Sequence, residues 1–273
     1  MKRVANKKPL VTVITPAYNA EKFIVEAIDS VLNQTYKEFE YIIIDDCSTD
    51  KTLKIAQTYA KKDKRVRVYK NEKNLGIAGN RNKGVSLAKG KYIMWQDADD
   101  ISISDRMENQ VNILEKNKDM GIVGGALLFF DEKGEHGRRE YPTNDLELRK
   151  IIYRYSPVAQ PAAMIRKSIL DECGEYKYPP TEDLDMSFRI GRISKFANLD
   201  KIVIKYRESE GSATYSQLRR MEKNTLKIRW NNRSSGYRVG LKDIFFNLAQ
   251  AVSLFLIPSK LKIALFKKIR NTA

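Results

Sequence analysis

The carboxylates at positions 97, 99 and 100 are the feature of this sequence with the clearest chemical meaning. Asp97, Asp99 and Asp100 follow the apolar run Tyr92–Trp95 almost directly. Carboxylates packed this closely raise each other's pKa values unless a cation compensates their charge. Oxygen ligands suit Mg2+ or Mn2+, and these ions commonly bind a substrate's phosphates as well. The cluster therefore predicts a divalent cation site that holds a phosphorylated substrate.

The same carboxylates have an interpretation that requires no ligand. Asp-rich turns after strands also cap helices, and Asp100 or Ser102 could cap the next helix. Three carboxylates exceed what capping requires, so the pattern favours the cation site.

Asp45 and Asp46 form a second acidic group after an apolar segment, Phe39–Ile44. A carboxylate there could accept a hydrogen bond from a nucleobase N–H or a ribose hydroxyl. The pair also suits an ordinary turn, because Ser, Thr and Asp follow it.

The segment Asn74–Asn82 resembles a phosphate-binding loop in its glycine and asparagine content. We expect a turn that opens a helix, with Arg81 placed to meet a diphosphate or a base. The GxGxxG and GxxxxGK(S/T) spacings are missing, so neither a Rossmann fingerprint nor a P-loop is present.

Glu182 and Asp183 begin a predicted helix, where the helix dipole favours acids whatever their function. The functional interpretation is a general base that takes a proton from an acceptor hydroxyl.

Alternating apolar segments and helical stripes indicate the elements that position these groups. The predicted strands are Leu10–Thr15, Phe39–Ile44, Val66–Lys70, Tyr92–Trp95, Gly121–Phe130 and Ile202–Tyr206. The predicted helices cover residues 23–32, 51–60, 82–88, 104–114, 146–155 and 182–193. Nearly continuous apolar strands between helices are typical of an α/β fold with a parallel sheet covered on both faces. Ligands bind beyond the carboxyl ends of such strands. Four polar clusters fall there, namely Pro16–Asn19, Asp45-Asp46, Asn74–Arg81 and Asp97–Asp100.

Composition divides the 273 residues into two parts. We predict a main domain over residues 1–220 and a basic helical tail over residues 221–273. The whole chain has a formal net charge of +16, and the tail holds 11 Lys/Arg against 2 Asp/Glu. This asymmetry predicts an anionic partner for the tail, either lipid headgroups or nucleic acid.

The tail contains an apolar stripe from Leu241 to Leu256, which Pro258 interrupts, and then apolar residues alternating with lysines up to Phe266. Two short basic amphipathic helices of this kind are better suited to lying on a membrane than to crossing it. The alternative is that they pack on the main domain, since a helical stripe cannot distinguish lipid from protein. No uncharged apolar run of about 18 residues and no secretory signal is apparent. We therefore expect a cytoplasmic protein, peripheral on the cytoplasmic face of a membrane.

Cysteine and histidine usage excludes several site classes. Cys47 and Cys173 lie in no CxxC motif, so a disulfide framework or zinc site is not expected, and a reducing compartment fits. His136 is the only histidine, which excludes a two-histidine metal site. We expect it in an exposed loop.

Four segments in order carry a resemblance to a known family. Pro16-Ala17-Tyr18-Asn19, the segment from Asp45 to Asp50, Asn74-Leu75-Gly76 with Arg81-Asn82, and Asp97-Ala98-Asp99-Asp100 resemble the motif series of inverting family 2 glycosyltransferases. The resemblance covers roughly residues 10–215. It implies the GT-A fold, a Rossmann-like and mostly parallel sheet with helices on both faces, to which the C-terminal amphipathic helices are added. It also implies a nucleotide-sugar donor, most commonly a UDP-sugar, and Mn2+ or Mg2+.

The resemblance also implies roles for individual residues. Asp46 would bind the nucleobase, in a pocket shaped by Pro16, Tyr18 and Arg81. Asp97 and Asp99 match the family's DxD motif, in which Asp97 would contact the nucleotide and Asp99 would bind the metal.

On the acceptor side, Asp183 matches the family's catalytic base, and Glu182 precedes it. Gln160 stands where relatives often carry histidine before proline. Arg207 resembles the start of a loop that closes over the donor. Many relatives have histidine two residues later, where this sequence has Ser209, so Arg207, Glu208 or Ser209 would have to take its place.

Two other function classes compete with this interpretation. A sugar nucleotidyltransferase would carry an Arg-bearing, glycine-rich loop near its N-terminus, and Val13–Asn19 has none. A nucleic-acid-binding protein would fit the net charge, but no recognisable module is present, and we expect no nucleic acid partner. The predicted acceptor is a glycan or a lipid-linked saccharide of cell-surface polysaccharide synthesis. A relative without activity is disfavoured because the acidic motifs are intact.

Overall fold

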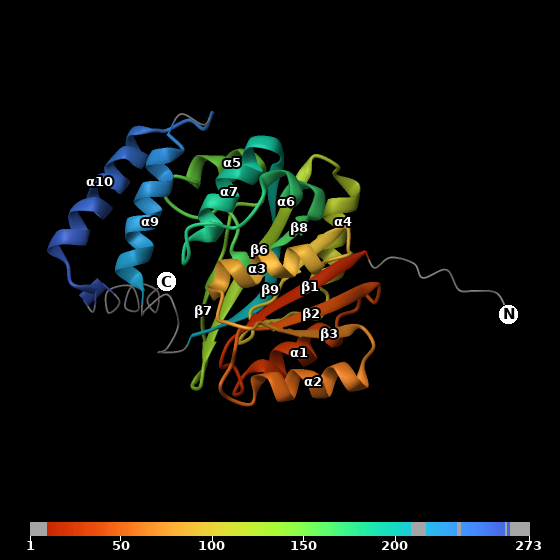
Figure 1. Cartoon of the computed structure of the whole chain (residues 1–273). Helices are drawn as coiled ribbons and strands as arrows, with labels where there is room; N and C mark the ends of the chain where they lie inside the picture. Colours follow the sequence, from red (N-terminus) through yellow and green to blue (C-terminus); the bar gives the residue numbers. More distant parts are fainter. Residues whose placement is uncertain (1–9, 209–216, 234–235, 260, 263–273) are drawn as a thin grey trace.

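The structure, a computed structural model, describes residues 10–208, 217–233, 236–259 and 261–262. These residues form one nine-stranded sheet with the order β3-β2-β1-β4-β8-β6-β9-β5, and β7 pairs with β6 at its side (Figure 1). The strands are β1 (Val11–Ala17), β2 (Phe39–Asp45), β3 (Val66–Lys70), β4 (Tyr92–Trp95), β5 (Ile101–Ser102), β6 (Met120–Asp131), β7 (Gly134–Arg139), β8 (Met164–Arg166) and β9 (Lys195–Arg207).

Half of this sheet is parallel, as the sequence predicted. β1 pairs in parallel with β2 and β4, and β2 pairs in parallel with β3. β8 then runs antiparallel to both β4 and β6, although β6 and β9 are parallel again. The mostly parallel sheet that the resemblance implied is therefore interrupted by the antiparallel β8, whose direction the sequence did not indicate. Strands that are buried on both faces are apolar throughout, so their residue pattern carries no sign of their direction.

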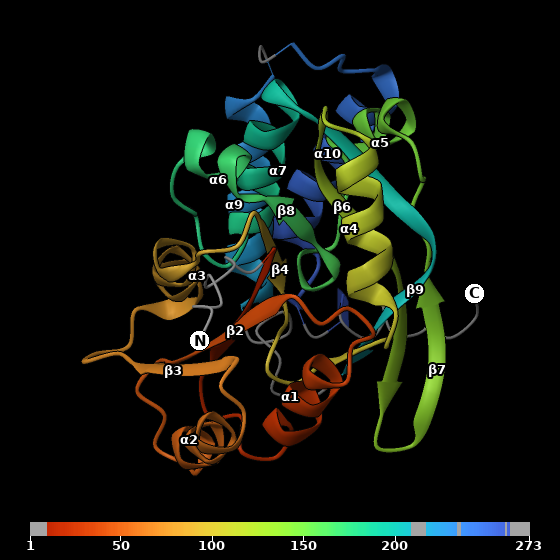
Figure 2. The same cartoon turned by 90° about the vertical axis from the view of Figure 1, so that its right-hand side faces the viewer.

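Helices cover both faces of the sheet, which confirms the α/β fold class (Figures 1 and 2). One apolar cluster joins the sheet to α1, α2 and α4, and another joins it to α3, α5, α6 and α7. In β2, Ile42 and Ile44 belong to the second cluster, whereas Tyr41 and Ile43 belong to the first, because successive strand residues face opposite ways. The helices of the main domain are α1 (Ile24–Leu32), α2 (Thr52–Lys62), α3 (Gly76–Leu87), α4 (Arg106–Lys116), α5 (Asp145–Ile151), the 3-10 turn η1 (Gln160–Ala162), α6 (Lys167–Cys173) and α7 (Glu182–Ile193).

The segment predicted as a turn at Asn74–Asn82 is mostly helical, since α3 begins at Gly76. Gly76 has a φ of +69°, a conformation that favours glycine at the start of the helix. Gly84, in the same helix just beyond the segment, serves packing instead. A Cβ at Gly84 would lie 2.5 Å from Ile14 of β1, so the helix approaches the sheet closely there. The side chain of Asn80 accepts a hydrogen bond from Asn71 at 2.9 Å. Composition suggested a loop because it cannot reveal such tertiary contacts.

Several local boundaries also differ from the prediction. His136 lies in strand β7 instead of an exposed loop, and its ring Nε2 lies 2.9 Å from Glu208. The predicted strand at Ile202–Tyr206 is the end of the longer β9, and the predicted helix at Leu146–Tyr155 ends at Ile151. Short polar strands such as β7 lack the apolar alternation that sequence reasoning requires.

In the described part of the chain after the main domain, α9 (Leu218–Asn231) and α10 (Leu241–Leu256) pack together at one side of the molecule (Figure 1). α9 runs through residues 220 and 221, so the predicted division of the chain falls inside a helix. Of the helices that the structure describes, none has the length and apolar character needed to traverse a bilayer.

Candidate active site

The acidic loop Asp97–Asp100 leaves the carboxyl end of β4 and is held in place by the end of β9. Asp100 is buried, and its Oδ1 accepts a hydrogen bond from the backbone N–H of Arg207 at 2.8 Å. The Arg207 side chain donates to the backbone oxygen of Asp99 at 2.9 Å and to Glu26 of α1 at 2.8 Å. Arg207 therefore fixes the shape of this loop.

The helix-capping interpretation of these carboxylates does not hold. α4 begins after Asp105, and no side chain caps it. The Oδ2 atom of Asp100 and the Oδ1 atom of Asp97 are buried without a hydrogen-bond partner. The acidic loop thus has carboxylate oxygens that its own fold leaves unsatisfied.

The electrostatics of the loop agree with this geometry. Burial, and then the neighbouring charge of Asp97, raise the pKa of Asp99 to about 6. Burial and the charges of Asp99 and Asp97 raise the pKa of Asp100 well above its usual range. Arg106 is buried close to this loop and donates to the Trp95 backbone oxygen at 2.9 Å, and burial lowers its pKa to about 9. A bound cation would relieve this accumulation of negative charge.

Arg81 of α3 connects the acidic loop to the start of α7. Its guanidinium is buried, forms an ion pair with Glu182, and lies 3.6 Å from Oδ1 of Asp97. Its carbon Cζ lies 5.5 Å from the ring centre of Trp95 and 6.0 Å from that of Tyr176. Burial alone would lower the pKa of Arg81, but the carboxylates of Glu182 and Asp97 outweigh it and raise the pKa. Three segments that are distant in the sequence therefore meet at one guanidinium.

Asp183 lies beside this ion pair in the first turn of α7 and is partly buried. Burial raises its pKa, and the charge of Arg81 and the backbone N–H of Leu184 offset this effect in part. A carboxylate with a raised pKa is a stronger proton acceptor at neutral pH. The site thus contains a group suited to general base catalysis.

Gln160 lies on the same side of the site, in η1. It is buried, and its Nε2 donates to the Tyr176 hydroxyl at 3.1 Å. The ring of Tyr176 stands edge-on to Trp95, with 5.5 Å between centroids. Gln160 therefore supports the aromatic wall beside Arg81.

Asp46 lies at the carboxyl end of β2 and caps the start of α3. Its Oδ1 accepts hydrogen bonds from Asn71 at 2.6 Å and from the Leu75 N–H at 2.8 Å, and its Oδ2 accepts one from the Gly76 N–H at 2.9 Å. The carboxylate is fixed by these contacts, and it holds the helix that carries Arg81.

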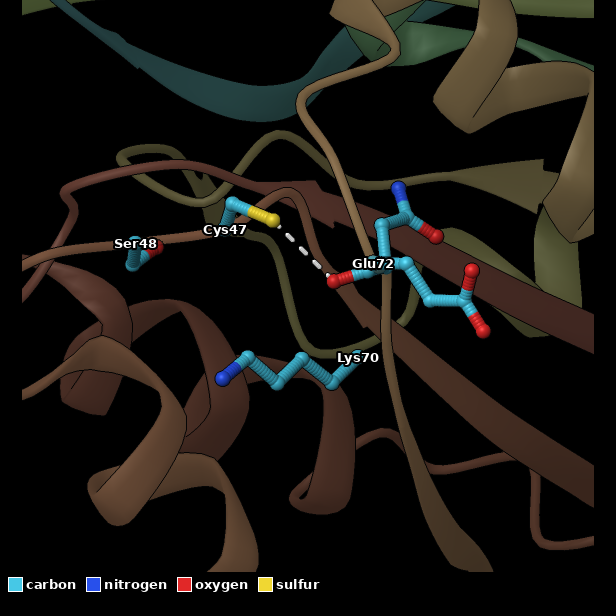
Figure 3. Close-up of a pocket in the computed structure, with 5 residues that line it drawn as sticks. Cys47, Ser48, Lys70 and Glu72 are labelled. Carbon is cyan, nitrogen blue, oxygen red and sulfur yellow. Dashed lines mark hydrogen bonds between the residues drawn. The ribbon is translucent and has the colours of Figure 1, made fainter.

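A cavity of about 380 Å³ adjoins Asp46, between the ends of β2 and β3 (Figure 3). It is lined by Cys47, Ser48, Lys70, Asn71 and Glu72, and the Cys47 thiol donates to the Asn71 backbone oxygen at 3.0 Å. Asn71 both lines this cavity and holds Asp46. Asp46, the residue predicted to bind the nucleobase, therefore lies next to a surface pocket.

The remaining predicted residues of the donor side are placed as follows. Pro16 is buried in β1, where it lies opposite Ile44. Tyr18 follows the strand, and 54% of its surface is exposed. Ser209 lies outside the described residues.

Sequence reasoning missed three residues that support the site. Arg106, Tyr176 and Asn71 are all buried or partly buried and join segments far apart in the chain. A buried arginine at the start of the helix that follows an acidic loop could have been suspected, but nothing near Tyr176 or Asn71 in the sequence marks them.

A divalent cation fits the residues present. Within the described ranges, no three His, Cys, Asp or Glu side chains are grouped closely enough to bind a metal by themselves. Mg2+ in proteins is commonly bound by one or two carboxylates together with substrate phosphates. Asp99, with its raised pKa, and Asp97, with its unsatisfied oxygen, suit such a shared site.

The buried ion pair of Arg81 leads to a stability prediction. Replacing Arg81 with lysine keeps the charge but removes the planar fork that reaches both Glu182 and Asp97. We expect the free energy of unfolding to fall by about 1.5–3 kcal/mol, measured by urea denaturation. Arg138→Lys is the matched control, because Arg138 and Glu140 form an exposed pair at the end of β7, and it should change stability by less than about 0.5 kcal/mol. Equal effects of the two substitutions would contradict a central role for Arg81.

The sequence matches the glycosyl transferase family 2 model over residues 12–174. An uncharacterised glycosyltransferase of Methanocaldococcus jannaschii is 34% identical over 235 residues, which cover 83% of this chain and 81% of that protein. TuaG of Bacillus subtilis, whose name assigns it to teichuronic acid biosynthesis, is 42% identical over 129 residues, covering 47% of this chain and 51% of that protein.

Two solved structures share the fold. The mannosyltransferase PcManGT of Pyrobaculum calidifontis, solved with GDP-Man and Mn2+, has a TM-score of 0.66 and 16% identity, covering 97% of this chain and 81% of that one. Staphylococcus aureus TarS 1-349, solved with UDP-GlcNAc, has a TM-score of 0.60 and 22% identity, covering 89% of this chain and 80% of that one. At these identities the structural likeness concerns the fold alone.

Proposed function

This chain belongs to glycosyltransferase family 2, and we propose that it is a metal-dependent inverting enzyme that transfers a sugar from a nucleotide-sugar to a hydroxyl group. The supporting observation is the meeting of acidic loop, α3 and α7 at Arg81, which brings the DxD carboxylates and the predicted base to one site. A donor diphosphate and an acceptor hydroxyl need these two kinds of group side by side.

In the proposed reaction, Asp183 takes the proton of the acceptor hydroxyl. The acceptor oxygen forms a bond to the anomeric carbon while the bond from that carbon to the diphosphate breaks. The electron pair of the broken bond leaves with the nucleoside diphosphate, and the configuration at carbon is inverted. Mn2+ or Mg2+, bound by Asp99 with Asp97, would neutralise the diphosphate and make it a better leaving group.

The residues around this centre have supporting roles. Asp46 receives the nucleobase together with Pro16 and Tyr18. Arg81 holds Glu182 and so sets the position of the α7 N-terminus. Arg207 keeps the acidic loop in shape.

The relatives support the donor and acceptor classes that we propose. TarS and PcManGT were solved with UDP-GlcNAc and GDP-Man, so we propose a UDP- or GDP-sugar as donor. The similarity to TuaG favours an acceptor in cell-surface polysaccharide synthesis, either a glycan or a lipid-linked saccharide. We place the reaction on the cytoplasmic face of a membrane, where nucleotide sugars are available.

Thermal unfolding with nucleotides tests this function. A ligand that binds only the folded state stabilises it by about 2.7 kcal/mol at 100 times its Kd. We expect UDP or GDP, with their sugars, to raise the Tm by several degrees when Mn2+ is present and by less without it. If no nucleotide raises the Tm with either metal, the proposal is wrong. Stabilisation by nucleoside triphosphates with release of pyrophosphate from a sugar phosphate would instead indicate a nucleotidyltransferase.

A further inference from the structure

The inner face of α10, which contacts the rest of the protein, is largely polar. Asp243 pairs with Arg154 at 2.8 Å, and Asn247 donates to the Tyr153 backbone oxygen at 2.9 Å. Gln250 accepts a hydrogen bond from Arg229 of α9 at 2.8 Å. Positions 243, 247 and 250 follow helical spacing, so they lie on one face. In an ordinary surface helix this inner face would be apolar.

The outer face of α10 is apolar and exposed. Leu241, Phe245 and Phe255 expose 85%, 76% and 83% of their surface. The exposed apolar side chains of this face are Leu241, Ile244, Phe245, Leu248, Val252, Phe255 and Leu256. Trp230 of α9 is also exposed. Most of the large apolar side chains exposed in the described part of the chain lie between residues 230 and 261. A contiguous apolar patch of this kind marks an interaction surface.

The exposed charges of the segment that carries this face have one sign. Between residues 217 and 262 the acids are Glu222 and Asp243, and both are buried in ion pairs with Lys262 and Arg154. The exposed charged residues in the described part of this segment are Arg219, Arg220, Lys223, Lys227, Arg233, Arg238 and Lys242. Among its described residues, the segment that carries the apolar face therefore exposes positive charges and no carboxylate.

We propose that the outer face of α10 docks on the surface of an anionic lipid bilayer. Its apolar side chains enter the headgroup region, and the surrounding Lys and Arg side chains contact acidic lipids. A second copy of the chain fits this face less well, because two identical positively charged rims would repel each other.

The docking also bears on the acceptor of the proposed reaction, and this part of the inference rests on the proposed function. α9 lies between α10 and α7 (Figure 1), and Asn224 of α9 donates to the Pro179 backbone oxygen just before α7 at 3.1 Å. The docked face is therefore one helix away from the helix that begins with Glu182 and Asp183. This arrangement selects a lipid-linked saccharide as the acceptor class.

Flotation of the full chain with vesicles tests the docking, and it requires no nucleotide. We expect binding to vesicles of phosphatidylcholine mixed with phosphatidylglycerol and much weaker binding to phosphatidylcholine alone. Replacing Phe245 and Phe255 with serine should reduce vesicle binding by about tenfold each. The control Leu146→Ser removes an equally exposed apolar side chain, 73% exposed, from the N-terminal end of α5, and binding should stay unchanged.

The charge component has its own variants and its own contrary outcomes. Arg238→Gln and Lys242→Gln should each weaken binding to the anionic vesicles about fivefold. If the unaltered chain does not float with anionic vesicles, the proposal fails. It also fails if light scattering shows a dimer that dissociates when Phe245 and Phe255 are both replaced with serine, because the face would then join two copies. Nucleotide binding, measured separately by thermal shift, keeps either failure distinct from a failure of the proposed transferase activity.

Discussion

Asp183→Asn is expected to reduce turnover by about 10²–10⁴-fold, the usual effect of removing a general base. Asparagine has the shape of aspartate but cannot accept the acceptor's proton. Nucleotide binding should change little, because in the proposed reaction the acidic loop and Asp46 would hold the donor. Steady-state kinetics with the nucleotide-sugar that the thermal screen selects, together with calorimetry of the matching nucleotide, would measure both quantities.

Asp185→Asn is the matched control, because Asp185 lies in the same first turn of α7 and pairs with Arg189 at 2.6 Å. Its turnover per folded molecule should remain near that of the unaltered protein. If Asp183→Asn also retains near-normal turnover, Asp183 is not the base.

The pH profile separates a base from a residue that only supports the structure. A base works when it is deprotonated, so activity falls as the pH drops through its pKa. Burial raises the pKa of Asp183, with Arg81 opposing, and the charged or titratable groups beside it include Glu182, Asp97 and Tyr141. The acid limb of the profile should therefore lie above the ordinary aspartate value of about 3.9. Residual activity of Asp183→Asn should lack this limb.

The sequence was sufficient for the parts of the site that are local in the chain. Strand β3 has the predicted bounds, as does β4, and the acidic loop follows β4 as expected. β4 and its loop carry a local signal, namely an apolar run that ends in clustered acids. The family resemblance rests on four motifs in a fixed order, which is more specific than any single motif.

The sequence was not sufficient for contacts between distant segments. Arg81 and Glu182 are 101 positions apart, and each has a local explanation that conceals their pairing. Glu182 suits a helix N-terminus on dipole grounds alone. The outward apolar face of α10 could not be predicted either, because its stripe would read the same if it packed on the domain. Which side of a helix faces inward is decided by its partners, here Arg154 and Arg229.

Asp99→Asn is expected to remove the effect of Mn2+ on nucleotide binding. In the unaltered protein, Mn2+ should increase nucleotide affinity by about 10²-fold or more, since a metal on a diphosphate contributes several kcal/mol of charge stabilisation. In the variant, calorimetry with and without Mn2+ should give nearly equal affinities, and turnover should fall in proportion. Asp171→Asn, on an exposed carboxylate of α6 paired with Lys167, is the control and should keep the full response to the metal.

Asp99→Asn should increase stability although it weakens metal-dependent binding. This combination is expected of a carboxylate whose role is to bind a ligand. The pKa of Asp99 is raised to about 6 in the folded protein, by burial and then by Asp97. Above that pH the ionised carboxylate therefore lowers the free energy of unfolding. Below the ordinary pKa of about 3.9 the carboxyl is neutral in both states, and this penalty disappears. Asparagine carries no charge, so at pH 7 the metal-free variant should be more stable by about 1–3 kcal/mol in urea denaturation. Lower stability would mean that the carboxylate supports the fold instead. Greater stability combined with loss of the Mn2+ response would mean that the charge of Asp99 destabilises the fold and serves to bind the cation.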